Sequence, residues 1–517
     1  MNFDIVFVLL ALIGMIAALV WDKMRPGMVL LTVVVFFLCV GILTPKEMLE
    51  GFSNKGMITV AMLFLVSEGV RQSGALGQLI KKLLPEGKTT VFKAQARMLP
   101  PVAFVSAFLN NTPVVVIFAP IIKRWAEAVK LPATKFLIPL SYVTILGGIC
   151  TLIGTSTNLV VHGMILEAGF EGFSMFELGK VGIFIAIAGI IYIFLFSKRL
   201  LPDARPDTAV PDEEVEEGEK LHRVEAVLGA RFPGINKKLS DFNFQRHYGA
   251  EVKEIKTRNG QRYVDHLEDV VLREGDTLVV MADDTFIPTW GESSVFVLLT
   301  NGNDPDTSGK KKRWLALILL VLMIVGATVG ELPATKEMFP DIKLDMFFFV
   351  CITTIIMAWT NIFPARKYTK YISWDILITI ACAFAISKAM VNSGVADCVA
   401  GFIIGLSDDY GPHVLLAILF VITNLFTELI TNNAAAALAF PLALSISAQL
   451  GVSPTPFFVV ICMAASASFS TPIGYQTNLI VQGIGNYKFT DFVRIGLPLN
   501  IITFLISVIL IPLIWNF

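Results

Sequence analysis

Two short polar motifs interrupt the apolar runs of this 517-residue chain. They are Asn110-Asn111-Thr112 and Thr431-Asn432-Asn433. Polar side chains and irregular backbone are costly at membrane depth, so they persist where protein or a water-filled cavity surrounds them. Their amide and hydroxyl oxygens are hard ligands of the kind that alkali cations prefer. The motifs therefore predict a binding site within a membrane.

A glycine-containing loop follows each polar motif. Both glycines permit a helix to unwind, and the residues after them add candidate substrate ligands: Ser156, Thr157 and Asn158 after Gly154, and Gln476, Thr477 and Asn478 after Gly474. Helices that begin at the motifs and loops would direct four N-termini at one chamber, and helix N-termini attract anions. We expect Asn111 or Thr112 to cap the helix that starts near Pro113, and Thr157 and Thr477 to cap those after the loops.

The paired motifs belong to an internal duplication. Three matches recur in the same order. The first pairs Ser67-x6-Gly74 with Ser387-x6-Gly394, and the second pairs Ser106 and Pro120, which flank the first polar motif, with Thr427 and Pro441, which flank the second. The third match is between the two glycine loops. All share an offset of 320 or 321 residues. Repeats with broken helices usually carry the substrate and ion site at their interface.

The elements that position these motifs are apolar segments of spanning length. The chain is 55% hydrophobic and 16% charged, which is typical of a polytopic membrane protein. The segments cover roughly 4–21, 27–44, 57–72, 98–125, 134–168 and 177–198, then 313–330, 345–363, 373–391, 412–449, 455–484 and 490–515. The first lacks the basic start and cleavage site of a signal peptide and is expected to be a retained span.

Basic residues predict the topology. Lys23, Arg25, Lys198 and the run 310–313 all lie on the cytoplasmic side if each repeat crosses the membrane five times and the N-terminus is outside. The second repeat is then inverted, and the hairpins re-enter from opposite sides. The expected fold class is an all-α polytopic membrane protein with two inverted repeats, in the inner (plasma) membrane, with both termini outside and residues 201–312 cytoplasmic.

A polar insert separates the two repeats. The expected division is a first membrane repeat (1–200), an acidic linker (201–220), a small α/β domain (221–295), a second linker (296–312) and a second repeat (313–517). Within the domain, 223–228, 250–255 and 277–281 are strand-like, and Asn259-Gly260 fits a hairpin turn.

At the polar motifs the chain resembles the divalent anion:sodium symporter family of the ion transporter superfamily. In that family, similar triplets at the hairpin tips bind substrate and sodium, and Thr427-Glu428 looks like the family's Thr-Glu pair. The resemblance implies Na+ as coupling ion, a homodimer and an elevator mechanism. It also implies two sodium sites, one from Ser106, Asn111, Gly154 and Thr155, and one from Thr427, Asn432, Pro472 and Gly474.

Departures from the family's dicarboxylate transporters favour sulfate as the substrate. The chain has Asn433 where those carry threonine, and Thr155-Ser156 and Tyr475-Gln476 where they carry loop prolines. In this respect it is similar to bacterial and algal members assigned to sulfate. A dicarboxylate such as succinate stays the alternative.

The insert resembles the TrkA-C domain of potassium transport regulators. The similarity lies in Pro233-Gly234, Tyr248-Gly249 and 273–276. It implies either a dimerising or stabilising role, or regulation by an unidentified small ligand, since fold does not fix function.

Three functional classes remain open from sequence alone. They are a secondary transporter of small divalent anions, an ion transporter or channel gated by the insert, and a membrane sensor. The chain carries no HExxH, Gly-x-Ser-x-Gly or catalytic-cysteine pattern, so we do not expect an enzyme. The expected partners are an inorganic or dicarboxylate anion, membrane lipid and a second copy of the chain, with no nucleic acid.

Overall fold

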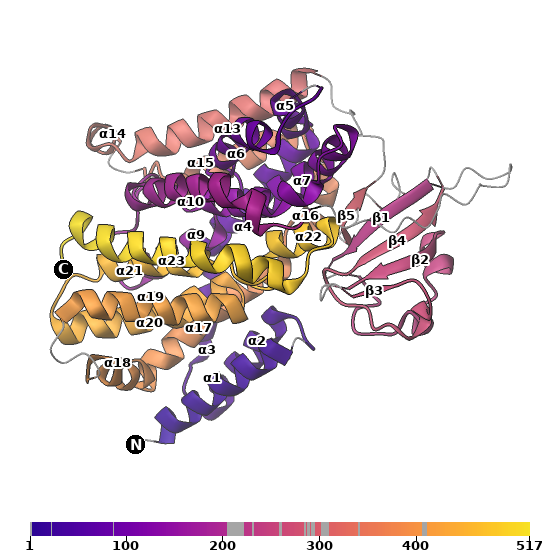
Figure 1. Ribbon diagram of the computed structural model, residues 1–517. Helices are drawn as coiled ribbons and strands as arrows, with labels where there is room; N and C mark the ends of the chain where they lie inside the picture. The colour runs from indigo at the N-terminus through magenta and orange to yellow at the C-terminus, as the bar shows by residue number, and fades with distance from the viewer. Residues whose placement is uncertain are drawn as a thin grey trace, which may run out of the picture.

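The computed structural model contains a large helical part and one small β-sheet (Figure 1). It describes residues 3–21, 23–85, 87–203, 222–229, 232–257, 261–283, 286, 290, 295–300, 310–339, 342–405 and 411–517. Most of the predicted acidic linker, most of the second linker and the Asn259-Gly260 turn lie outside these residues.

Helices occupy the predicted apolar segments, and short helices lie between them. Before the sheet they are α1 (Phe3–Trp21), α2 (Pro26–Val40), α3 (Pro45–Glu50), α4 (Lys55–Gln72), α5 (Ala75–Leu83), α6 (Val91–Ser106), α7 (Asn111–Ala128), α8 (Leu137–Gly148), α9 (Ser156–Glu167) and α10 (Gly179–Leu200). After it they are α13 (Lys310–Gly330), α14 (Pro333–Met338), α15 (Met346–Trp359), α16 (Tyr368–Tyr371), α17 (Trp374–Asn392), α18 (Val395–Gly405), α19 (Gly411–Leu429), α20 (Asn432–Leu450), α21 (Thr455–Ser466), α22 (Gln476–Gly485) and α23 (Phe489–Ile514). Of these, α3, α5, α14, α16 and α18 lie outside the predicted segments.

Corresponding helices in the two halves end in the same way. The chain leaves α4 at Gly74 with φ +71° and leaves α17 at Gly394 with φ +76°. Both values lie in the left-handed region, which favours glycine because it has no Cβ. The sequence match at these glycines therefore reflects one backbone turn used twice.

Eight described helical stretches are long and apolar enough to cross a membrane. They are Phe3–Trp21, Pro45–Gln72, Gly179–Leu200, Lys311–Gly330, Trp374–Asn392, Gly411–Leu429, Asn432–Leu450 and Phe489–Ile514. Outer helices also expose large apolar side chains, as Ile183, Phe184 and Ile187 do on α10. Such faces suit hydrocarbon rather than water, and the chain is an integral membrane protein.

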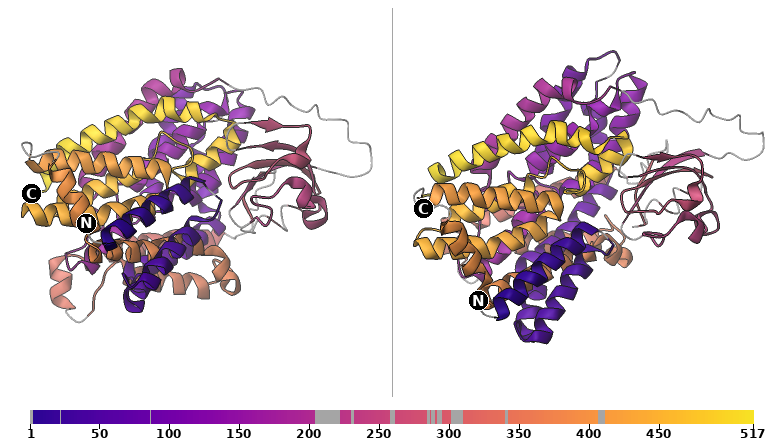
Figure 2. Two further views of the ribbon diagram at one scale, coloured as in Figure 1. Left: turned by 90° about the horizontal axis from the view of Figure 1, so that it is seen from below. Right: turned by 60° about the horizontal axis from the view of Figure 1, so that its bottom comes forward.

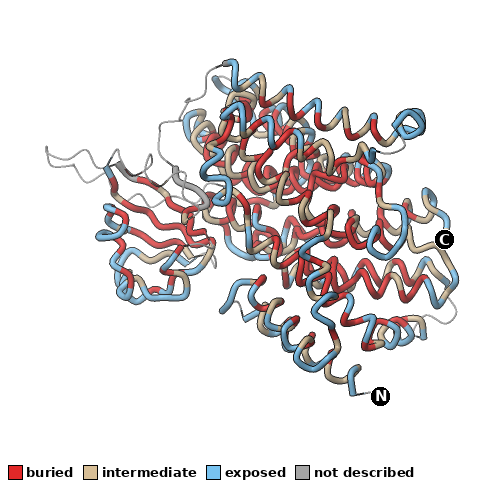
Figure 3. Tube along the Cα trace, turned by 180° about the vertical axis from the view of Figure 1, so that it is seen from behind, coloured by how far each residue is buried: buried red, intermediate tan, exposed pale blue. Residues whose placement is uncertain are grey.

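Buried residues concentrate in the middle of the helical part (Figure 3). α20 and α21 are buried along almost their whole length, as is α8 in the first half. The helices that carry the polar motifs are therefore surrounded by protein.

The sheet has five strands in the order β3-β2-β4-β1-β5, and every neighbouring pair is antiparallel. The strands are β1 (His222–Leu228), β2 (Glu251–Lys256), β3 (Arg262–Tyr263), β4 (Thr277–Ala282) and β5 (Phe296–Thr300), with the short helix α11 (Phe244–Tyr248) between β1 and β2. β5 pairs with β1, so the sheet extends past residue 295, where the sequence predicts its end.

The sheet lies at one end of the helical part, and both termini lie toward the other end (Figures 1 and 2). A buried ion pair, 2.9 Å long, joins Lys123 of α7 to Glu225 of β1. On α22, a Cβ at Gly483 would lie 2.5 Å from Thr277 Oγ1 of β4, so the missing side chain makes room for the strand. The sheet thus touches two helices that begin at the polar motifs and loops.

Candidate functional site

The first polar motif is the tip of a helical hairpin. α6 ends at Ser106 and α7 begins at Asn111, with Asn110 as its N-cap residue. The predicted cap at Asn111 or Thr112 is wrong: the helix starts earlier, and Pro113 occupies its third position. Asn111 is the first residue of the helix rather than its cap. Its Oδ1 accepts a 2.8 Å hydrogen bond from Ser106 Oγ. Both residues are fully buried.

The second polar motif forms an equivalent tip. α19 ends at Leu429, and α20 begins at Asn432 after the N-cap residue Thr431. Thr427 Oγ1 donates to Asn432 Oδ1 at 2.9 Å, which repeats the Ser106–Asn111 bond of the first tip. Each tip therefore presents one amide oxygen held by one hydroxyl.

The two glycine loops are built with the same hydrogen bonds. In the first, Gly154 N donates to Thr151 Oγ1 at 3.1 Å and Asn158 Nδ2 donates to Thr151 O at 2.9 Å. In the second, the corresponding bonds join Gly474 to Thr471 at 3.2 Å and Asn478 to Thr471 at 3.1 Å.

Each loop is also anchored to the first arm of its own hairpin. Thr151 Oγ1 donates to the carbonyl of Ala107, and Thr471 Oγ1 donates to that of Glu428. Sequence reasoning missed both threonines, although they share the 320-residue offset.

The helices after the loops begin earlier than predicted. Their N-cap residues are Thr155 and Tyr475, neither of which makes a side-chain capping bond. The predicted caps at Thr157 and Thr477 are wrong, because the helices after the two loops already begin at Ser156 and Gln476. Thr477 and Asn478 instead accept hydrogen bonds from Ser141 of α8, so they position α22.

The tip of each half contacts the loop of the other half. At the first tip, Asn111 Nδ2 donates to the Tyr475 hydroxyl at 2.6 Å and Thr112 Oγ1 donates to Gln476 Oε1 at 3.3 Å.

At the second tip, Asn433 Oδ1 accepts from Ser156 Oγ at 3.3 Å and from Thr157 Oγ1 at 3.2 Å. The N-terminus of α7 thus meets that of α22, and the N-terminus of α9 meets that of α20. These four ends create a local environment that favours an anion.

The first set of oxygens fits an alkali cation. A Cβ on Gly148 would lie 2.7 Å from Asn111 Oδ1 and 3.1 Å from Gly154 O, so both oxygens approach the same point beside a residue without a side chain. Ser106 Oγ and Thr155 Oγ1 belong to buried residues. Ser106 Oγ bonds to Asn111, and Thr155 Oγ1 bonds to Tyr475, which itself bonds to Asn111.

The second set is similar but has one more hydroxyl. A Cβ on Gly474 would lie 2.7 Å from Thr427 O, 3.2 Å from Thr471 Oγ1 and closest to Ser468 Oγ. Ser468 corresponds in the repeat to Gly148 of the first half. Pro472, which was also expected at the second sodium site, is buried. In the described part of the chain no group of three or more His, Cys, Asp or Glu side chains gathers.

Several buried oxygens at the site lack a hydrogen-bond partner among the described residues. They include Thr431 Oγ1 and Glu428 Oε2 at the second tip and Asn158 Oδ1 in α9. Buried polar atoms are normally satisfied, so unpaired ones at an expected site are available to a bound ion.

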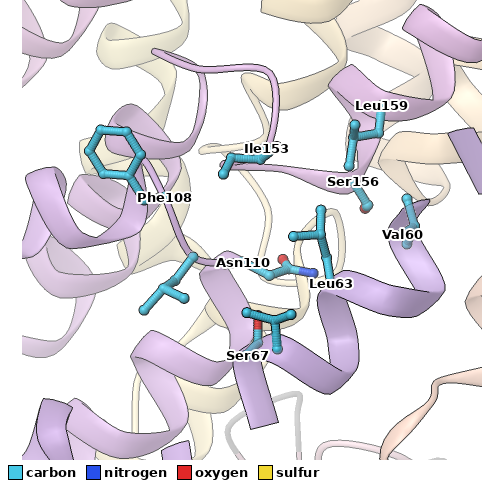
Figure 4. A pocket seen from close by; sticks show the side chains of 10 residues that line it. Val60, Leu63, Ser67, Phe108, Asn110, Ile153, Ser156 and Leu159 are labelled. Atoms are coloured by element: carbon cyan, nitrogen blue, oxygen red, sulfur yellow. The ribbon is translucent and has the colours of Figure 1, made fainter. Parts of the chain in front are cut away.

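A narrow pocket opens beside the first tip (Figure 4). Asn110 lies at its centre, between Ser67 of α4 and Ile153 and Ser156 of the first loop. Sequence reasoning used Ser67 as a repeat marker and missed it as a lining residue. The pocket places a serine and an asparagine next to the N-terminus of α7, where an anion is favoured.

Glu428 fastens the second loop to the membrane core. Its Oε1 accepts from Ser470 N at 2.8 Å and from Asn500 Nδ2 at 2.7 Å. These bonds reach the second loop and α23 rather than α20.

Comparison with known proteins supports a transport site. The CitMHS family model, described as citrate transporter, matches residues 16–446 and 338–517. The chain is 30% identical to an uncharacterized transporter of Synechocystis sp., covering 94% of this chain and 93% of that protein. It is 28% identical to a putative sulfur deprivation response regulator of Chlamydomonas reinhardtii, over 90% and 94% of the two chains. Sodium/sulfate cotransporter 2 of the same alga is 30% identical over 54% of this chain and 31% of its own length.

Proposed function

Because the chain belongs to the CitMHS citrate transporter family of secondary transporters, we propose that it is a sodium-coupled symporter of a small divalent anion, with sulfate as the preferred substrate. The observation that carries the proposal is the reciprocal contact of tips and loops: Asn111 with Tyr475, and Asn433 with Thr157. It forms one site from four helix N-termini and two oxygen sets.

The site suggests how the ion and the anion are coupled. Neither tip nor loop carries an Arg or Lys, so the charge of a divalent anion is balanced by helix N-termini and by cations at the two oxygen sets. Sodium bound at Asn111 and Asn432 therefore raises anion affinity electrostatically, and the anion raises sodium affinity by the same factor.

We further propose that the two halves are inverted repeats that form an elevator. The matched hairpins, loops and left-handed turns support the repeat. The position of both termini away from the sheet supports a cytoplasmic insert with both termini outside (Figure 2). In this scheme the hairpins and loops move together as one body within a homodimer.

The preference for sulfate rests on the second tip. Asn433 presents an amide where Thr112 presents a hydroxyl at the first tip, and sulfate offers four oxygens in a small volume to such donors. The named relatives from Chlamydomonas are consistent with sulfur or sulfate as the ligand. The family's description as citrate transporters keeps a dicarboxylate as the second candidate.

A role for the insert in regulation is favoured by where it docks. The TrkA-C-like sheet contacts α7 through Glu225 and α22 through Thr277. A ligand or a partner copy that moves the sheet would therefore act on the helices that carry the site. Gating of an ion pathway by the insert is the competing function, and it differs by giving flux that needs no coupling gradient.

The proposed function is tested by uptake of radiolabelled sulfate into proteoliposomes that contain the purified full chain. We expect uptake to require an inward sodium gradient and to be competed by excess sulfate more strongly than by succinate. Stronger competition by succinate would replace sulfate with a dicarboxylate, and uptake without any sodium gradient would overturn symport.

A further inference from the structure

Tyr475 occupies the centre of the site, although neither motif includes it. It is the N-cap residue of α22, and its side chain is 9% exposed. Its side chain extends from the second loop to the first oxygen set. There its hydroxyl lies 2.6 Å from Asn111 Nδ2 and 3.0 Å from Thr155 Oγ1.

The bonding capacity of this hydroxyl matches its surroundings. A phenol has one donor hydrogen and accepts through its oxygen. Asn111 Oδ1 accepts from Ser106 Oγ, so the Asn111 group that faces Tyr475 is the amide nitrogen Nδ2. The phenol oxygen accepts from Asn111 Nδ2, and its own hydrogen can point to Thr155 Oγ1.

This arrangement fixes the orientation of the amide at the first tip. The oxygen and nitrogen ends of an asparagine side chain have nearly the same shape, so hydrogen bonds rather than packing decide which end faces a site. With Nδ2 held by Tyr475, the Asn111 Oδ1 atom faces Ser106. A flipped amide would direct N–H groups at a cation and repel it.

We propose that Tyr475 is a positioning residue for the first cation site, holding the Asn111 carbonyl oxygen toward bound sodium through its hydroxyl. The inference rests on the proposed function and extends it. A residue of the second half thereby sets the sodium affinity of an oxygen set in the first half.

The test is Tyr475→Phe, which removes only the hydroxyl, in the full chain in proteoliposomes. We expect the half-saturating sodium concentration for sulfate uptake to rise about tenfold, as for loss of one or two buried hydrogen bonds. The maximal rate at saturating sodium should stay within about twofold, because no ligand oxygen is removed.

Tyr192→Phe is the matched control. The Tyr192 hydroxyl is buried in α10 and donates to Ile495 O at 3.0 Å, away from both tips. A second readout is the unfolding temperature of the detergent-solubilised protein, measured in sodium chloride and in an equal concentration of choline chloride. The increase caused by sodium should be smaller in Tyr475→Phe than in wild type and unchanged in Tyr192→Phe.

The outcomes separate the inference from the proposed function. Wild-type uptake that ignores sodium would overturn both. Sodium-dependent wild-type uptake, with the same half-saturating sodium concentration in Tyr475→Phe as in Tyr192→Phe, would leave the symporter standing and overturn the role of Tyr475. A lower maximal rate alone, with unchanged sodium dependence, would also overturn it.

Discussion

Thr155 Oγ1 and the Tyr475 hydroxyl lie 3.0 Å apart and are separated by 320 residues, the same offset that aligns the two halves of the chain. Corresponding positions of the two loops therefore touch each other. One loop contributes a small hydroxyl there and the other a long phenol. The site has paired architecture with unequal chemistry.

Replacing either tip amide should stop transport. Asn111→Ala and Asn432→Ala each remove a buried oxygen that a bound cation would contact, and we expect sulfate uptake to fall at least about tenfold. The melting temperature of each variant should change little from that of wild type. Asn392→Ala is the control, since its side chain bonds to Ile42 O and Glu47 at the protein surface. Near-normal uptake in both tip variants would remove these residues from the site.

Substrate preference should depend on Asn433. Its Oδ1 accepts from Ser156 and Thr157, and Asn433→Thr removes the amide while making the second tip resemble the first. We expect the ratio of sulfate to succinate inhibition constants to shift about tenfold toward succinate. Competition uptake in one batch of proteoliposomes measures it, and an unchanged ratio would exclude Asn433 as a selectivity determinant.

A methyl group at Gly148 should disable the first cation site. The added Cβ of Gly148→Ala would lie 2.7 Å from Asn111 Oδ1 and displace it, so uptake should fall to under about a tenth of wild type. Gly14→Ala on α1, where nothing lies within 4 Å, is the matched control. Equal uptake by the two variants would contradict the placement of the oxygen set.

Loosening the sheet should raise the transport rate without changing the substrate. Glu225 pairs with Lys123 of α7 and, at 3.2 Å, with Lys256 of β2, and all three side chains are largely buried. Glu225→Gln leaves two buried lysines without this carboxylate, which weakens docking on α7. If docking restrains the hairpin, maximal sulfate uptake should rise at least about fivefold.

The control for that experiment is Glu251→Gln, which breaks an exposed ion pair with Lys253 on β2. Exposed pairs contribute little, so its uptake should match wild type. A changed sulfate-to-succinate ratio in Glu225→Gln would instead assign the sheet a part in substrate selection.

The apolar segments and the polar tips were predictable because both depend on local composition and on the cost of burying polar groups in hydrocarbon. The repeat was readable for the same reason, since matched tips need matched residues such as Ser106 and Thr427. Helix starts were not, because the N-cap position depends on where the backbone turns. Asn110 and Tyr475 became caps without supplying a capping side chain.

Contacts between the halves were also beyond reach of the sequence. Nothing near residue 475 shows that a tyrosine there reaches Asn111, because the bond depends on how two distant hairpins pack. The outlying strand β5 was missed for a similar reason: Phe296–Thr300 is defined as a strand by its pairing with β1.

The bond from Asn111 to Tyr475 also bears on how the protein is made. Its partners are 364 residues apart, and at about 5 to 20 residues per second the ribosome needs roughly 20 to 70 s to synthesise the second after the first. During that interval Asn111 Nδ2 lacks its Tyr475 partner, although Ser106 can already bond the Asn111 oxygen. This contact between the halves can therefore form only after most of the chain has been synthesised.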